Sequence, residues 1–150
     1  MEKQLEIGQM MHRIMHSWDR LTRAKQTKAG LNNEIINNGR ILGFLRRNAG
    51  TDVYQKDIEQ ETGLTKSAIS NILTSLEKQG YVKRLAVEKD ARFKKIVLTR
   101  KGTSVDNKLG RAFQYVDGNF TKGLTEEEQD GLIRCLRIIY DNMKEMEAEQ

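Results

Sequence analysis

The sequence contains no proline and a single cysteine, Cys135. A proline inside a helix costs about 3 kcal/mol, so a chain without proline is free to form long helices. One cysteine excludes an intramolecular disulfide framework. No apolar run approaches the roughly 20 residues that a membrane-spanning helix needs, and residues 1–9 lack the apolar core of a signal peptide. We therefore expect a cytoplasmic, mainly helical protein.

Hydrophobic residues are also scarce. They make up 37% of the chain, against about 45–50% in typical globular proteins. The helical apolar stripes that do exist include one at each end of the chain, at residues 7–21 and 132–146, far from the central segment. Each stripe needs a surface to pack against. The composition therefore predicts a thin core that gains burial from a partner subunit.

Charge is distributed unevenly along the chain. The net charge is +5, from 26 basic and 21 acidic residues. Residues 81–101 hold eight basic and two acidic side chains, whereas residues 124–150 hold three basic and eight acidic ones. Lys and Arg displace condensed counterions from phosphates. The basic segment is therefore expected to face an anionic partner.

Apolar spacing and capping residues predict the order of the elements. Apolar positions repeat with helical period along most of the chain, and Ser, Thr or Asn precedes several of these segments as a helix cap. Two β-prone runs, 81–87 and 93–98, flank a polar tip at 88–92 and predict a hairpin. The expected fold is mainly α with a small β-hairpin wing (α+β). The expected helices span 3–28, from 32 or 33 to 48, 55–62, 66–79, from 99 to about 120, and from 125 to the C-terminal end.

The segment from Gln55 to Gly80 is the most informative part of the sequence. Two helices joined by a short turn at Gly63 match a helix-turn-helix. The outer face of the second helix is short and polar, which suits hydrogen bonding to base edges in the major groove, and Asn71 matches adenine. The residues of this segment predicted to contact DNA are Gln55, Lys56, Lys66, Ser67, Ser70, Asn71 and Thr74.

The hairpin adds a second predicted contact. Arg92 at its tip is suited to the minor groove, where A·T tracts concentrate negative potential, and Lys94 follows as a further DNA-binding residue. Asp90 is unusual in a loop that approaches phosphate. We interpret it as a brace that pairs with Arg84 or Arg92 and holds the tip.

Three motifs together resemble the MarR family of bacterial transcriptional regulators: the Leu-Glu-Lys-Gln-Gly run at 76–80, Asp-Ala-Arg at 90–92, and Leu-Thr-Arg-Lys-Gly at 98–102. The resemblance covers nearly the whole chain as one domain, 1–150. It implies a homodimer in which a winged helix-turn-helix, 32–100, lies between dimerisation helices 3–28 and 101–148. Ala91 and Phe93 depart from the charged or polar residues usual at their positions, which implies a weaker wing.

The resemblance implies sequence-specific binding of double-stranded DNA at a palindromic operator. It also implies repression that a small ligand relieves, with no cofactor. For such a ligand, a small aromatic effector, we expect an apolar pocket. Its predicted lining residues are Met11, Met15, Trp18, Phe44 and Phe113.

Two further features are expected to be structural. His12 and His16 lie four residues apart on one helix face, but two ligands make no metal site and we expect none. Cys135 lies in the last apolar stripe, where a buried and inert thiol is expected.

Three other classes of function are weighed against DNA-binding regulation. A protein-docking module would show Leu or aromatic side chains at residues 66–71, and this segment has none outside its apolar stripe. An enzyme would need a catalytic constellation, and neither a Gly-rich phosphate loop nor a nucleophile motif is present. Non-specific DNA architecture stays open.

Overall fold

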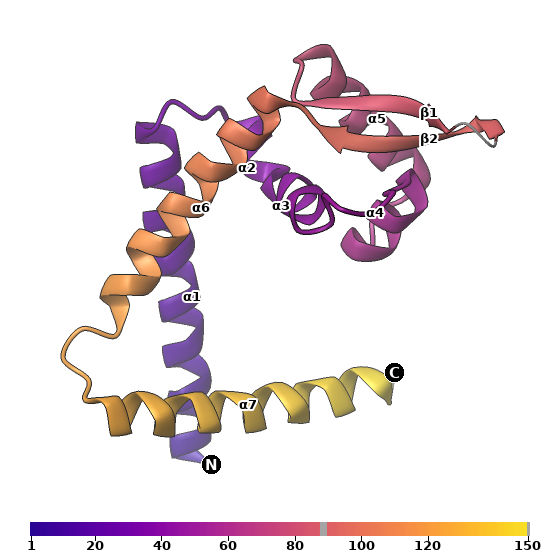
Figure 1. Cartoon of the computed structure of the whole chain (residues 1–150). Coiled ribbons are helices and arrows are strands. Elements are labelled where there is room, and N and C mark those ends of the chain that lie inside the picture. The colour runs from indigo at the N-terminus through magenta and orange to yellow at the C-terminus, as the bar shows by residue number, and fades with distance from the viewer. Residues whose placement is uncertain (88–89, 150) are drawn as a thin grey trace. The chain divides into compact units, whose positions relative to one another are not determined.

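The computed structural model describes residues 1–87 and 90–149, and for residues 90–92 it describes the backbone only. The described chain forms two compact units, residues 1–114 and 115–150, with the boundary inside one helix. Two strands form an antiparallel hairpin, as predicted for a mainly α fold with a wing (Figure 1). In chain order the elements are α1 (Glu2–Lys28), α2 (Asn33–Asn37), α3 (Gly39–Arg47), α4 (Gln55–Thr62), α5 (Lys66–Lys78), β1 (Val82–Val87), β2 (Asp90–Leu98), α6 (Arg100–Phe120) and α7 (Glu126–Ala148).

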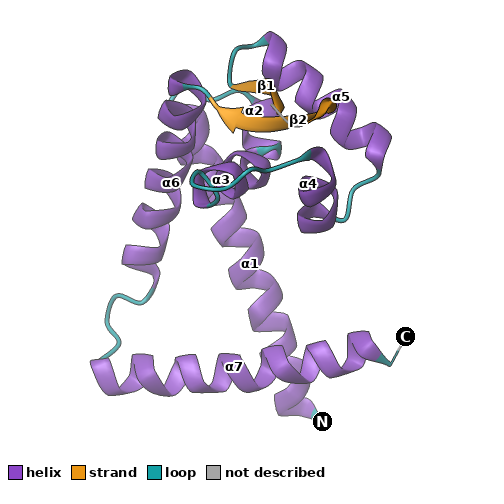
Figure 2. Ribbon diagram, turned by 45° about the vertical axis from the view of Figure 1, so that its right-hand side comes forward, coloured by secondary structure: helices purple, strands orange, loops and turns teal. Residues whose placement is uncertain are grey.

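The core of the first unit lies between the short helices and the hairpin. In Figure 2, α3, α4 and α5 gather beside β1 and β2 at one end of α1. The apolar positions of these elements repeat with the period of a helix or a strand, so each element turns one face inward. The most deeply buried large side chains, all under 2% exposed, are Ile35, Leu42, Ile58, Ile69, Leu73, Leu76 and Val82.

Side-chain caps begin the helices where the sequence predicts them. The Asn32 side chain accepts a hydrogen bond from the Ile35 amide at 2.9 Å, and Thr99 Oγ1 accepts one from the Gly102 amide at 3.0 Å. Thr125 and Glu128 form the predicted capping box at the start of α7. These caps bond backbone N–H groups that have no partner inside the helix.

The prediction of a single helix from residue 32 or 33 to residue 48 is wrong in one respect. This segment is divided into α2 and α3 at Asn38, whose φ is −100° and ψ is 10°. The Asn38 side-chain amide donates to the Glu34 carbonyl oxygen at 2.9 Å. Asn side chains compete in this way with the backbone bonds that continue a helix.

The hairpin is longer than the sequence predicts. Strand β2 begins at Asp90 rather than Phe93, so the strands occupy part of the tip predicted at 88–92. Val82 pairs with Leu98, and the register shifts between Ala86 and Val87, which marks a bulge or irregularity. Such a shift allows one strand to have more residues than the strand it pairs with. The alternation of apolar and polar residues along a strand does not predict this shift.

The second unit holds the end of α6, a turn and α7. No residue of α7 is buried, although its apolar residues follow helical spacing. The prediction that Cys135 is buried is therefore wrong for the single chain, since Cys135 is exposed. Near the C-terminal end of α7, a hydrogen bond and the charge of Glu147 raise the pKa of Lys144 above its ordinary value.

In the described part of the chain, no helix has both the length and the apolar composition needed to cross a membrane.

Gly102, buried in the first turn of α6, gives a test of this packing. A Cβ at this position would lie 2.1 Å from the Tyr81 carbonyl oxygen and 2.9 Å from a Leu98 methyl group. We expect Gly102→Ala to lower the free energy of unfolding by about 3 kcal/mol, because backbone must move to admit the methyl group. Thermal and urea unfolding followed by circular dichroism measure the change.

Gly110→Ala is the matched control in the same helix. A Cβ at Gly110 meets nothing within 4 Å. This variant is expected to be unchanged, or more stable by roughly 0.5–1 kcal/mol, because alanine favours a helix over glycine. Equal stability of the two variants would contradict the close contact between α6 and Tyr81.

Candidate nucleic-acid interface

The turn between α4 and α5 sets the position of the second helix. Gly63 has φ of +70°, a left-handed conformation that glycine adopts without strain. Thr65 Oγ1 then accepts a hydrogen bond from the Ala68 amide at 3.3 Å and caps α5. Ile58 of α4 and Ile69 of α5 are both 0% exposed. The turn, the cap and this apolar contact together form the predicted helix-turn-helix.

Burial of one face of α5 leaves the opposite face in solvent. Lys66, Ser67, Asn71 and Thr74 are exposed, and Ser70 is half-buried. The Thr74 hydroxyl donates to the Ser70 carbonyl oxygen at 2.8 Å, as Thr often does within a helix. The predicted contact residues of α5 thus share one face, which presents an ammonium group, hydroxyls and an amide.

Gln55 has a structural contact that the sequence did not suggest. Its side-chain amide donates to Glu59 Oε1 at 3.0 Å and to the Lys66 carbonyl oxygen at 3.2 Å. Gln55 therefore joins the start of α4 to the start of α5. Lys56, the next residue, is exposed and keeps its ammonium group in solvent.

Arg84 fastens the hairpin to the predicted recognition helix α5. Its guanidinium donates to Glu77 Oε2 at 2.9 Å, and its backbone amide donates to Glu77 Oε1 at 3.0 Å. A weaker contact of 3.4 Å reaches the Ser70 carbonyl oxygen. The predicted brace to Asp90 lies outside the described residues, because the Asp90 side chain is not described. Arg84 thus holds β1 against α5, a role the sequence analysis missed because seven residues and a turn separate it from Glu77.

A second polar contact holds the other side of α5. Glu34 of α2 accepts hydrogen bonds from the Ser75 hydroxyl and from the Gln79 side-chain amide, the latter at 2.8 Å. The Gln79 amide also donates to Ser75 Oγ at 3.1 Å. Glu34 lies 41 residues from Ser75, so no local pattern in the sequence indicates this contact.

The hairpin contributes further cations. Lys83 and Lys94 are exposed, while the Lys95 ammonium lies 3.0 Å from Asp52 Oδ1 and is neutralised there. The Ile96 amide donates to the Val53 carbonyl oxygen at 2.7 Å, which fixes β2 beside the segment before α4. The Arg92 side chain lies outside the described residues, so its predicted minor-groove contact is not tested.

The residues of the predicted apolar pocket lie in different places in the described single chain. Trp18 and Phe113 do stack, with centroids 5.4 Å apart. Phe113 lines a cavity between α3 and α6, whereas Phe44 lines a different hollow beside α4. Met15 is 61% exposed, and Met11 lines neither of these two cavities. In the single chain Phe44 and Phe113 thus face different hollows, and a pocket lined by all five residues stays a prediction.

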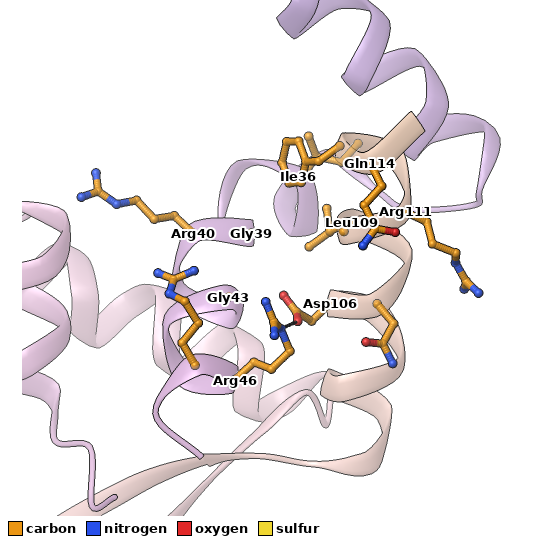
Figure 3. A pocket seen from close by; sticks show the side chains of 13 residues that line it. Ile36, Gly39, Arg40, Gly43, Arg46, Asp106, Leu109, Arg111 and Gln114 are labelled. Carbon is orange, nitrogen blue, oxygen red and sulfur yellow. Dashed lines mark ion pairs between the residues drawn. The ribbon is translucent and has the colours of Figure 1, made fainter. Parts of the chain in front are cut away.

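The cavity between α3 and α6 contains an ion pair. It has a volume of about 570 Å³, and Figure 3 shows Arg46 of α3 paired with Asp106 of α6 within it. The Asp106 side chain is 8% exposed, so its charge is compensated in a largely buried setting. Gly39 and Gly43 lie on the side of α3 that faces Leu109 and Asp106, which lets the two helices approach closely.

The two histidines of α1 have no further metal ligands gathered beside them among the described residues. His12 and His16 are exposed on α1. Among the residues that the structure describes, no three His, Cys, Asp or Glu side chains gather as metal ligands would.

Comparison with known proteins finds relatives of this arrangement. Residues 36–92, from α2 to the start of β2, match the MarR family. An HTH-type transcriptional regulator of Bacillus cereus is 26% identical over 139 residues, 89% of this chain and 92% of the relative. A second B. cereus regulator is 29% identical over 97 residues, and there the chain spans 64% of the relative's length.

Solved structures show the same fold over most of the chain. A protein of Clostridium acetobutylicum assigned to the MarR family of transcriptional regulators is 28% identical, with a TM-score of 0.70 and coverage of 91% of this chain and 98% of that one. S. aureus MepR in complex with DNA has a TM-score of 0.69 at 24% identity and covers 91% of this chain and 98% of its own. The matched winged-helix segment, the related regulators and the shared fold show that this chain is similar to the MarR family of transcriptional regulators.

Proposed function

We propose that the chain is a sequence-specific DNA-binding regulator that binds a palindromic operator as a homodimer in the cytoplasm. The observation that carries the proposal is the face of α5 opposite the core, where Lys66, Ser67 and Asn71 are exposed beside the basic hairpin. Short polar side chains on a helix match the donors and acceptors of the major groove. The structure of MepR with DNA supports the proposal, because that protein has the same fold.

Exposed apolar faces support the homodimer. In the first unit, Ile7, Met10 and Ile14 of α1 are each about half exposed. In the second unit, α7 carries Leu132, Leu136 and Met143 at exposures between 38% and 54%. Amphipathic helices in proteins gain most of their stability by packing their apolar face against another surface. A second copy of the chain would supply that surface and duplicate α5 for a two-fold symmetric operator.

We further propose that the regulator is a repressor that a small ligand releases. The cavity between α3 and α6 supports this part, because its volume of about 570 Å³ lies in the range of ligand sites, roughly 300–1,000 Å³. It lies between a predicted dimerisation helix and the helix that precedes α4. A ligand that favours one arrangement of these helices would shift the spacing of the two recognition helices and weaken DNA binding.

In-vitro selection of duplexes bound at physiological salt tests DNA binding and symmetry together. We expect an inverted repeat with half-site centres about 34–36 Å apart, one turn of DNA, because a two-fold dimer presents α5 twice. Sedimentation of the purified chain gives its mass in parallel. The proposal would be contradicted if the chain is a monomer and enriches no duplex above the random starting pool. Binding of duplexes without sequence preference would favour an architectural role.

Asn71→Ala tests base recognition by α5. An Asn amide that bonds adenine bidentately discriminates against other bases by about 1–3 kcal/mol, so the variant is expected to lose preference at one position of each half-site. Competition titrations with operators substituted at each position measure this loss. Asn119→Ala, on an exposed position near the end of α6, is the matched control and should keep the full preference.

Arg92→Ala tests the wing. We expect weaker binding to all duplexes, with the slope of log affinity against log salt reduced in magnitude by about 0.9 for each phosphate that the variant no longer neutralises. Lys122→Ala removes one positive charge from the turn after α6 and should leave both affinity and slope unchanged. Identical behaviour of the two variants would remove the wing from the interface.

A further inference from the structure

The recognition helix α5 has a polar anchor on the side of α2. Glu34 Oε1 accepts a hydrogen bond from the Ser75 hydroxyl, and Glu34 Oε2 accepts one from the Gln79 side-chain amide at 2.8 Å. The Gln79 amide also donates to Ser75 Oγ at 3.1 Å, which closes a ring of three side chains. All three residues are half-buried, and hydrogen bonds are stronger away from bulk water.

The short helix that carries Glu34 is itself fixed at both ends. Asn32 caps α2 through the Ile35 amide, and Ile35 is 1% exposed. At the other end, the Arg23 guanidinium of α1 donates to Asn37 Oδ1 at 3.0 Å. A helix of five residues is too short to be stable alone. These contacts therefore hold the backbone from which the Glu34 carboxylate extends to α5.

The anchor lies at the opposite end of α5 from the predicted base contacts. A helix rises 1.5 Å per residue, so Ser75 lies about 12 Å along the axis from Ser67, and a tilt of about 5° over this length displaces one end by about 1 Å. The buried Ile69 and Leu73 do not prevent a small tilt, because apolar attraction is not directional. A displacement of about 1 Å takes a hydrogen bond to a base edge out of the roughly 2.7–3.2 Å range in which it forms.

Contacts with DNA phosphates tolerate the same displacement. A Lys ammonium is a point charge on a flexible stem, so it follows a phosphate when the helix tilts. Glu34 is also negatively charged, so removing its charge does not weaken the attraction to phosphates. Loss of the anchor should therefore reduce the selection of a sequence and leave the general attraction to DNA intact.

We propose that Glu34 is a positioning residue for sequence recognition. Through Ser75 and Gln79 it sets the angle at which α5 presents its exposed polar face to the bases. Glu34 is not among the residues predicted to contact DNA, so it acts on selectivity through α5. This role in selectivity rests on the proposed function, whereas the anchor itself does not.

Two variants of Glu34 separate the hydrogen bonds from the charge. Glu34→Met keeps the length of the side chain and removes both acceptor oxygens. Glu34→Gln removes the same charge, but its carbonyl oxygen can accept from Gln79 and its amide can donate to Ser75 Oγ. The quantity measured is the ratio of affinities for a selected duplex and a random duplex at constant ionic strength. We expect Glu34→Met to lower this ratio about tenfold, as when one bidentate base contact is lost, and Glu34→Gln to stay within about twofold of the unsubstituted chain.

The affinity for random duplex distinguishes positioning from general support of the fold. We expect it to be unchanged or slightly higher in both variants. A residue that only supports the fold would lower both affinities by the same factor and leave their ratio unchanged. That result, or equal ratios in Glu34→Met and Glu34→Gln, overturns the proposal.

Ser75→Ala removes the anchor from the α5 side and keeps the test independent of how well Glu34→Met folds. Alanine favours a helix more than serine does, so this variant is expected to fold. It should also lower the ratio of affinities, and an unchanged ratio would contradict the proposal.

Hydrogen exchange without DNA separates the anchor from the proposed function. Amides in the second half of α5 are expected to exchange faster in Glu34→Met than in Glu34→Gln, because α5 has lost its contact with α2. If the unsubstituted chain prefers no duplex, the proposed function fails together with the role in selectivity, and exchange still decides whether Glu34 holds α5. If the chain selects a duplex and Glu34→Met keeps the full ratio, the proposed function stands and the positioning role is wrong.

Discussion

Burial of one face of α5 is the constraint from which the proposed interface follows. Ile69, Leu73 and Leu76 are each 0% exposed, and each such side chain stabilises the fold by about 1.5–3 kcal/mol. Because a helix turns once every 3.6 residues, fixing these three side chains in the core also fixes the direction of those on the opposite side. The exposure of Ser67 and Asn71 is therefore a consequence of core packing.

Apolar packing alone leaves a helix free to slide or tilt, and polar contacts restrict α5 on three sides. Glu34 of α2 holds Ser75 and Gln79, Arg84 of β1 holds Glu77, and Lys101 and Thr99 hold the carbonyl groups that follow α5. Each contact comes from a different element. The angle of the recognition helix thus depends on α2, on the hairpin and on α6 at once, and a change in any of them reaches the predicted DNA-binding face.

The elements that the sequence predicted correctly are those with local signals. Thr65 and Thr125 cap helices through bonds three residues away, and the apolar repeat identifies the buried side of α5. Two of the contacts that it missed join distant residues: Glu34 and Ser75 are 41 apart, and Lys95 and Asp52 are 43 apart. Spacing on one helix likewise does not show which neighbour Phe44 or Phe113 faces, and the two line different hollows in the single chain.

The two cavities of the first unit show how a neighbouring charge changes the chemistry of similar side chains. In one, the buried Asp106 carboxylate pairs with Arg46, and the pair links α3 to α6. In the other, which lies between the α1–α2 connection and the first half of α6, Arg100 and Lys108 have no such partner among the described residues. Both cavities border α6, the helix that connects the winged helix to a predicted dimerisation surface. Because Lys101 of α6 and Thr99 before it also hold the carbonyl groups that follow α5, both cavities border a helix on which the position of α5 depends.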